Sequence, residues 1–221
     1  MNKFKTMFLA GTVAAAMMAG GVSAFAAETE ADEKPVYEMD LVLETAKPIA
    51  AALRGFMLDE SMKQFDEAGL SFLDECDVSL NCPLIAAAQK NEDGTFTVFG
   101  ELCTYNYKLD GADLKFVSSW EPAAVITLSK ESDVSFVVDD VKYLPEGEAF
   151  ADAVDEVCVQ MGADSDFFLN HLPDSEEPAL LAEFLRFANE NPNVQTIEVR
   201  GEQMTVGGAA DEVAMFINGL L

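Results

Sequence analysis

Basic residues are scarce in this chain, whose 221 residues include 13 lysines and arginines against 40 aspartates and glutamates. The formal net charge of −27 at pH 7 argues against nucleic acid as a partner, because phosphate recognition relies on clustered lysine and arginine side chains. Anionic membrane surfaces are disfavoured for the same reason. The acidity does not indicate a wholly disordered chain, because half of the residues are apolar and a chain of this length can bury a substantial core.

Residues and motifs that carry chemistry are also few. The one histidine, His171, lies beside apolar residues, and no motif supplies partners for a catalytic triad or a metal site. The motifs of the common serine hydrolases, zinc proteases and nucleotide-binding proteins are absent. We therefore predict no enzymatic activity, no cofactor and no resident metal. Two alternatives stay open, namely weak calcium binding by surface carboxylates and an enzyme that uses an unrecognised pair of acids.

The N-terminus is typical of a secretory signal peptide. Two lysines among the first five residues precede an apolar run over residues 7–19, and an Ala-x-Ala cleavage site ends at Ala26. The alternative, a signal anchor, is disfavoured because a membrane span needs about 20 continuous apolar residues. We predict cleavage after Ala26, secretion to the extracytoplasmic side without stable membrane insertion, and an acidic disordered tether over residues 27–38.

The four cysteines of the chain are Cys76, Cys82, Cys103 and Cys158. In an exported chain an even number permits two disulfides, in any of three connectivities. We favour Cys76–Cys82, which flank a short polar loop, together with Cys103–Cys158, which join a strand-like run to the apolar side of a helix. The alternative is that some of the four are small buried hydrophobic side chains. No C-x-x-C spacing exists, which disfavours thioredoxin-type chemistry and ribbon-type zinc sites.

Residues 39–162 are predicted to form an α+β domain that begins with two helices. Apolar side chains repeat with helical spacing from Ile49 to Phe56, and Asp59 is placed to cap a second helix that carries Met62 inward. The period then changes to two, which predicts a meander of about five antiparallel strands over residues 83–89, 95–108, 112–120, 123–129 and 134–141. Asp-Gly pairs supply two of its turns, and a bulge is expected at Gly100.

Residues 163–221 are predicted to form a C-terminal helical extension with a small hairpin, arranged as helix, hairpin and helix. Gly162 ends the helix before it, Ser175 caps the next helix, and the hairpin turns around Gly201. The order of helices, antiparallel meander and helices defines an α+β class rather than a doubly wound sheet.

The residues that we predict to bind a ligand are the aromatics of the central strands, Tyr105, Tyr107, Phe116 and Trp120. In the third predicted strand the even-numbered residues from 114 to 120 are expected to share one face. Aromatic side chains on a curled sheet are able to line a concave ligand site. The alternative is that they belong to the core, which the strand pattern by itself favours.

Several segments together form a pattern of helix, strand, hairpin and strand, namely residues 53–56, 65–70, 98–101, 105–111 and 114–118. Over about residues 45–160 this pattern resembles a family of exported proteins from anaerobic, gut-type bacteria that has no assigned function. The resemblance implies a cradle of meander strands around helices, similar to the NTF2-like or cystatin-like folds, and it implies no activity. The chain departs from the family at Ser118-Ser119-Trp120, where the family has a Gly-Gly turn.

The leading functional hypothesis is an exported, non-enzymatic module that binds an extracellular peptide, glycan, small molecule or protein partner. The first alternative is a structural or assembly factor of the cell envelope. The second is an enzyme with an unrecognised carboxylate-based site.

Overall fold

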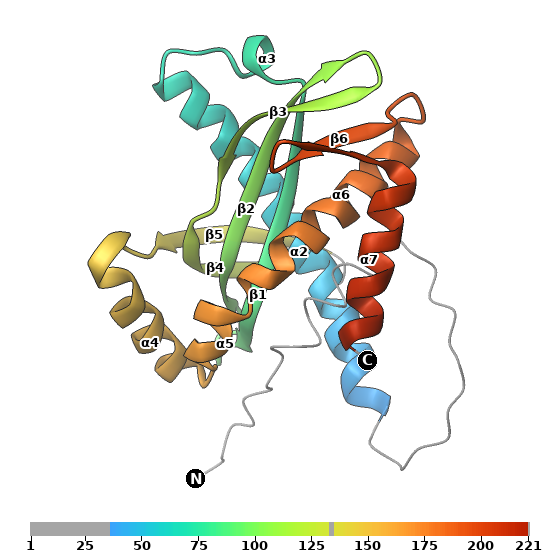
Figure 1. The fold of residues 1–221 in the computed structure, drawn as a ribbon. Helices are drawn as coiled ribbons and strands as arrows, with labels where there is room; N and C mark the ends of the chain where they lie inside the picture. The colour runs from blue at the N-terminus through green and yellow to red at the C-terminus, as the bar shows by residue number, and fades with distance from the viewer. Residues whose placement is uncertain (1–35, 133–134, 221) are drawn as a thin grey trace.

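The computed structural model describes residues 36–132 and 135–220, which form an α+β fold on one seven-stranded mixed sheet (Figure 1). The strands are β1 (Val78–Lys90), β2 (Phe96–Asp110), β3 (Asp113–Trp120), β4 (Ala123–Ser132), β5 (Ser135–Tyr143), β6 (Thr196–Val199) and β7 (Glu202–Thr205). The helices are α2 (Val36–Glu67), α3 (Phe72–Glu75), α4 (Phe150–Met161), α5 (Ser165–Asn170), α6 (Glu176–Glu190) and α7 (Val206–Leu220), with 3₁₀ turns η2 (Gly147–Ala149) and η3 (Pro173–Ser175). The predicted signal peptide and residues 27–35 of the predicted tether lie outside the described residues.

The long strand β2 organises the sheet. Its first edge pairs with β1, and its second edge is shared, because β4 pairs with residues 96–101 and β3 with residues 104–110. β3 and β4 thus follow β2 one after the other and do not pair with each other, which corrects the predicted five-strand meander. The link between them contains Pro122, whose fixed φ and missing N–H do not suit a hairpin turn, so the chain kinks there and continues along β2.

The C-terminal hairpin belongs to the same sheet. β6 pairs with β3 in parallel at Asp113 and Leu114, and β7 pairs with β6 in antiparallel fashion. The hairpin is therefore not a separate helix-hairpin-helix segment, because its first strand completes an edge of the main sheet. The domain boundary proposed between residues 162 and 163 stays a prediction.

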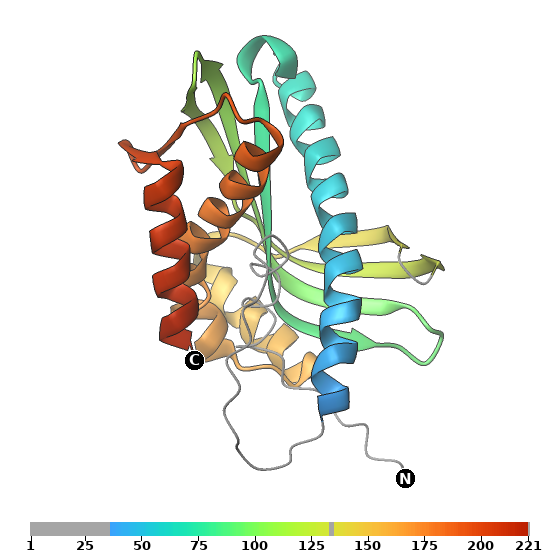
Figure 2. The ribbon, with the colours of Figure 1, turned by 90° about the vertical axis from the view of Figure 1, so that its right-hand side faces the viewer.

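Helices cover both faces of the sheet (Figure 2). On one face, Ile49, Leu53 and Met57 of α2 pack over a core that includes Val98 and Leu102 of β2. The other face lies under α4 to α7, and its core contains the odd-numbered residues of β2 together with side chains of those helices. The alternation along β2 is therefore unbroken at Gly100. The bulge expected there is wrong for β2, and a bulge lies instead in the partner strand β1 between Ile85 and Ala87.

α2 is one continuous helix from Val36 to Glu67, without a break at Asp59. The prediction of two helices is wrong here, and so is the tether prediction for residues 36–38. Met62 is 38% exposed rather than turned into the core. Aspartate caps a helix only where the residues before it are not helical, and here the helix runs through Asp59 and continues over the sheet.

Candidate functional site

The register between β2 and β3 shifts at Val117, which forms a bulge. Before the bulge, Phe116 pairs with Tyr107, and the two rings meet edge to face with centroids 6.0 Å apart. After the bulge, Ser118 and Trp120 turn toward the face that α2 covers. The prediction that the even-numbered residues from 114 to 120 share one face is wrong, because the extra residue of a bulge reverses the alternation.

The four aromatic residues predicted to bind a ligand therefore do not line one common site. Tyr107 is fully buried and Tyr105 is 9% exposed, so both belong to the core, and burial raises the pKa of both phenols. Phe116 is 45% exposed. Trp120 is half-buried on the other face, where its ring lies 5.4 Å from that of Tyr143. Ligand binding by these residues stays a prediction.

Polar side chains beneath the end of α2 bond one another. The Ser61 hydroxyl donates to Asn106 Oδ1 at 3.2 Å, and Asn106 Nδ2 donates to Ser118 Oγ at 3.2 Å. The Thr104 hydroxyl donates to Asn81 Oδ1 at 3.0 Å. These polar groups have hydrogen-bond partners within the fold, so they stabilise the packing of α2 and the strands and do not indicate a ligand site.

The outer edge of β3 is open over most of its length. β6 pairs with β3 only at Asp113 and Leu114, so residues 115–120 have no strand partner on that side among the residues that the structure describes. The Leu102 amide donates to Pro122 O at 2.9 Å, which shows that even-numbered residues of β2 point their backbone groups toward β3 and β4.

This alternation defines which backbone groups of β3 are free. Ser118 and Trp120 pair with even-numbered residues of β2, so their N–H and C=O groups point at β2. The N–H and C=O groups of Phe116 and Ser119 consequently point outward. Beside them, the side chains of Phe116 and Val117 are 45% and 38% exposed. The edge therefore offers both main-chain hydrogen bonds and apolar contacts.

Three carboxylates lie near this edge, on the face that carries Phe116. Burial, with repulsion from Glu176 and Glu121, raises the pKa of Glu101 to about 7. Burial and the charge of Glu121 also raise the pKa of Glu176. Glu101 Oε2 is buried without a hydrogen-bond partner in the described part of the chain. The arrangement attracts positive charge to this end of β3.

Sequence reasoning missed these acids as a group, although a signal for one existed. Glu101 is the acidic residue among the apolar odd-numbered residues of β2, between Phe99 and Cys103. An acid on a buried face of a strand is unusual, and it often marks a functional site. Its neighbours Glu121 and Glu176 come from distant segments, which no spacing rule brings together.

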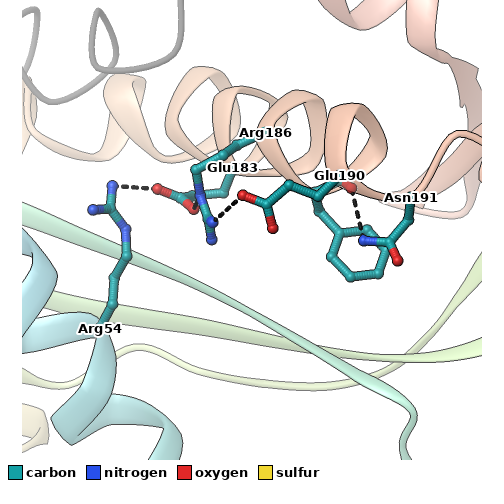
Figure 3. Close-up of polar contacts among 6 residues, drawn as sticks. Arg54, Glu183, Arg186, Glu190 and Asn191 are labelled. Carbon is teal, nitrogen blue, oxygen red and sulfur yellow. Dashed lines mark hydrogen bonds and ion pairs between the residues drawn. The ribbon is translucent and has the colours of Figure 1, made fainter.

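A second charged cluster ties the two helix layers together (Figure 3). Glu183 of α6 is buried and lies between two arginines, forming ion pairs with Arg54 of α2 and with Arg186 Nε at 2.8 Å. Arg186 Nη1 also lies 3.3 Å from Glu190 Oε1. Because α2 and α6 cover opposite faces, the Arg54–Glu183 pair joins them past the outer edge of β1. The cluster has a clear structural role.

A cavity of about 370 Å³ lies between α6, α7 and the β6–β7 turn. Leu181 and Phe216 supply apolar walls, and Glu177 and Arg200 supply charge. Arg200 has a φ of +51°, and its Nη1 lies 3.2 Å from Glu177 Oε2. Because Arg200 already pairs with Glu177 and its side chain is 73% exposed to solvent, the cavity offers a weaker case for a ligand than the edge of β3.

All four cysteines are buried thiols in the structure. The predicted Cys76–Cys82 disulfide is excluded, because the segment between them is not a loop but the start of β1. The extended chain from Val78 to Cys82 alone spans about 13 Å, whereas bridged Cα atoms lie within about 7 Å. Cys103 and Cys158 are likewise free thiols in the structure, and a link between them stays a prediction.

The other residues considered as sites from the sequence have roles in the local fold. Asp164 caps α5 by accepting the amide of Asp166 at 3.0 Å, and exposed His171 is the C-cap residue of that helix. Within residues 36–132 and 135–220, no group of three or more histidine, cysteine, aspartate or glutamate side chains is placed to hold a metal ion. Over the same residues no helix is long and apolar enough to cross a bilayer.

Comparison with known proteins adds no relative to this description. No family model, no curated protein and no solved structure matches the chain. The structure itself shows an α+β protein with an open, partly apolar sheet edge beside two half-buried acids, Glu101 and Glu176.

Proposed function

We propose that this protein is an exported, non-enzymatic binding module that takes an extended peptide segment as an added strand along β3. The observation that carries the proposal is the open outer edge over residues 115–120, where Phe116 and Ser119 direct backbone groups outward. Sheet edges of this kind bind peptides through main-chain hydrogen bonds, and the neighbouring side chains select the sequence.

The side chains beside the edge indicate the chemistry of the peptide. Phe116 and Val117 favour an apolar side chain opposite them. The carboxylates of Glu101, Glu121 and Glu176 favour a lysine or arginine on the same side of the peptide. The net charge of −27 supports the same preference, because it attracts basic partners over long range.

The alternative hypotheses give this edge, or the carboxylates beside it, a different role. An envelope assembly factor would use it for a strand of another structural protein, which is the same chemistry with a permanent occupant. An enzyme would use Glu101 as a general acid, since its pKa of about 7 suits that task. Export rests on the predicted signal peptide of residues 1–26, and the resemblance to exported bacterial proteins stays a prediction.

Labelled peptides of alternating apolar residues and lysine test the proposal, with matched peptides that carry glutamate in place of lysine. We expect the lysine peptides to bind about tenfold more tightly or better. Ser119→Pro removes an outward N–H without breaking a bond to β2, so it should abolish binding. Ser119→Ala keeps this N–H and should bind like the unchanged protein.

Thermal unfolding of both Ser119 variants accompanies the titrations, so that a loss of binding is read only from folded protein. Binding that survives Ser119→Pro, or a lack of binding to either set of peptides, contradicts strand addition at β3. Turnover of a substrate that is lost in Glu101→Gln would favour the enzyme hypothesis instead.

A further inference from the structure

Two of the four cysteines lie opposite each other on neighbouring strands of the sheet. Cys82 of β1 and Cys103 of β2 are Cα partners in the antiparallel register. The Leu102 amide points away from β1, toward Pro122 O at 2.9 Å, so the neighbouring Cys103 points its backbone groups at Cys82. The Cα atoms of such a hydrogen-bonded pair lie about 5.5 Å apart. This separation lies inside the range of roughly 4.4–6.8 Å found for disulfides.

The pair is enclosed by the helix layer. Cys82 and Cys103 are 2% and 0% exposed, and both belong to the core beneath α6. Glu183 and Glu176 of that helix act electrostatically on Cys82 and Cys103, respectively. Burial raises the pKa of both thiols well above the ordinary value, so the folded protein holds few reactive thiolates and excludes reductants from the pair.

The other two cysteines have no comparable partner. Cys76 precedes β1, at the end of α3, and Cys158 lies in α4. The strand that carries Cys82 is an edge strand with Pro83 in its middle, and it pairs only with β2 among the described strands. A covalent link at this position would hold an edge strand that is anchored on one side alone.

We propose that Cys82 and Cys103 form a cross-strand disulfide while the exported chain folds, before α6 covers them. One thiolate attacks the disulfide of a dithiol–disulfide oxidant and forms a mixed disulfide, releasing one oxidant thiol. The second thiolate then attacks the mixed disulfide and releases the other oxidant thiol. The two protein thiols together lose two electrons and two protons, and the oxidant disulfide gains them and becomes two thiols.

The test is made on the full chain in cells that export it. Cells are quenched with acid, free thiols are blocked with an alkylating reagent, and a digest without reductant is mapped by mass spectrometry. We expect one linked peptide pair containing Cys82 and Cys103, with Cys76 and Cys158 alkylated. Reduction of the purified, unfolded protein before refolding should lower its Tm by about 5–10 °C, because the link closes a loop in the unfolded chain.

Matched variants separate this pair from the others. Cys76→Ser with Cys158→Ser should keep both the linked peptide and the Tm difference, whereas Cys82→Ala with Cys103→Ala should lose both. Alkylation of all four thiols in exported protein, or a link that involves Cys76 or Cys158, overturns the proposal. The outcome is independent of peptide binding at β3, since the mapping requires no ligand.

Discussion

Glu101 is half-buried among apolar side chains, beyond Phe99 on the same face of β2, and its Oε2 atom is fully buried. Burial, with the charges of Glu176 and Glu121, raises its pKa from 4.5 to about 7. The folded protein therefore binds this proton more tightly than the unfolded chain. It follows that the stability gained from protonated Glu101 is present below about pH 4.5 and is lost as the pH rises to about 7.

Replacement of this one acid by its neutral amide should reveal the effect. We expect Glu101→Gln to raise the free energy of unfolding by about 1–3 kcal/mol at pH 8, and by less at pH 5. Urea unfolding at the two pH values measures it. Glu92→Gln, in an exposed turn, serves as the control and should change little at either pH. An equal gain at both pH values would show that titration of Glu101 is not the cause.

At the scale of elements, the central strand requires glycine at one point of close approach. A Cβ on Gly100 would collide with the carbonyl oxygen of Leu84 in the paired strand β1, where the backbone cannot move aside easily. The bulge of β1 lies at the same place, between Ile85 and Ala87. Gly55 of α2 differs, because a Cβ there meets nothing within 4 Å.

The same substitution at these two glycines should therefore have opposite effects. Gly100→Ala should lower the free energy of unfolding by about 2 kcal/mol or more, because the collision separates β1 from β2. Gly55→Ala should raise it by about 0.5–1 kcal/mol, because alanine suits a helix interior better than glycine. Chemical denaturation of both variants decides the matter. An unchanged free energy of unfolding in Gly100→Ala would mean that β1 can move away from β2 at this point without a loss of stability.

At the scale of the whole molecule, the sheet lies between two helix layers, and an ion pair beside its edge connects the two layers. Two separate apolar cores lie on the two faces, so neither core by itself connects α2 to α6. The Arg54–Glu183 ion pair makes this connection, and Arg186 completes the pairing of the buried carboxylate.

Removal of that carboxylate should cost far more than removal of a nearby exposed one. We expect Glu183→Ala to lower the free energy of unfolding by about 2–4 kcal/mol, because it leaves partly buried Arg54 without its partner. Glu190→Ala removes only an exposed partner of Arg186 and should cost less than about 0.5 kcal/mol. Equal costs in urea unfolding would argue against the role of Glu183 as the link between layers.

Local features of the fold follow from the sequence by itself. The predicted strand segments between residues 83 and 141 coincide with β1 to β5 apart from their ends, because alternation of apolar and polar residues reports which residues are extended. Gly162 ends α4 with a φ of +64°, and Asn191 ends α6, as their residue types predict. The scarcity of catalytic motifs and of basic residues is likewise a property of the sequence alone.

Pairing and proximity were decided only by the tertiary structure. Periodicity does not say which strand lies beside which, so the succession of β3 and β4 along β2 could not be predicted. A one-residue bulge at Val117 leaves almost no trace in the pattern, yet it moves Trp120 to the other face. Cys82 meets Cys103 because backbone hydrogen bonds set the register of β1 on β2. Glu176 comes near Glu101 because α6 packs on that face of the sheet. Such long-range choices depend on how layers pack together, which no local stretch of sequence encodes.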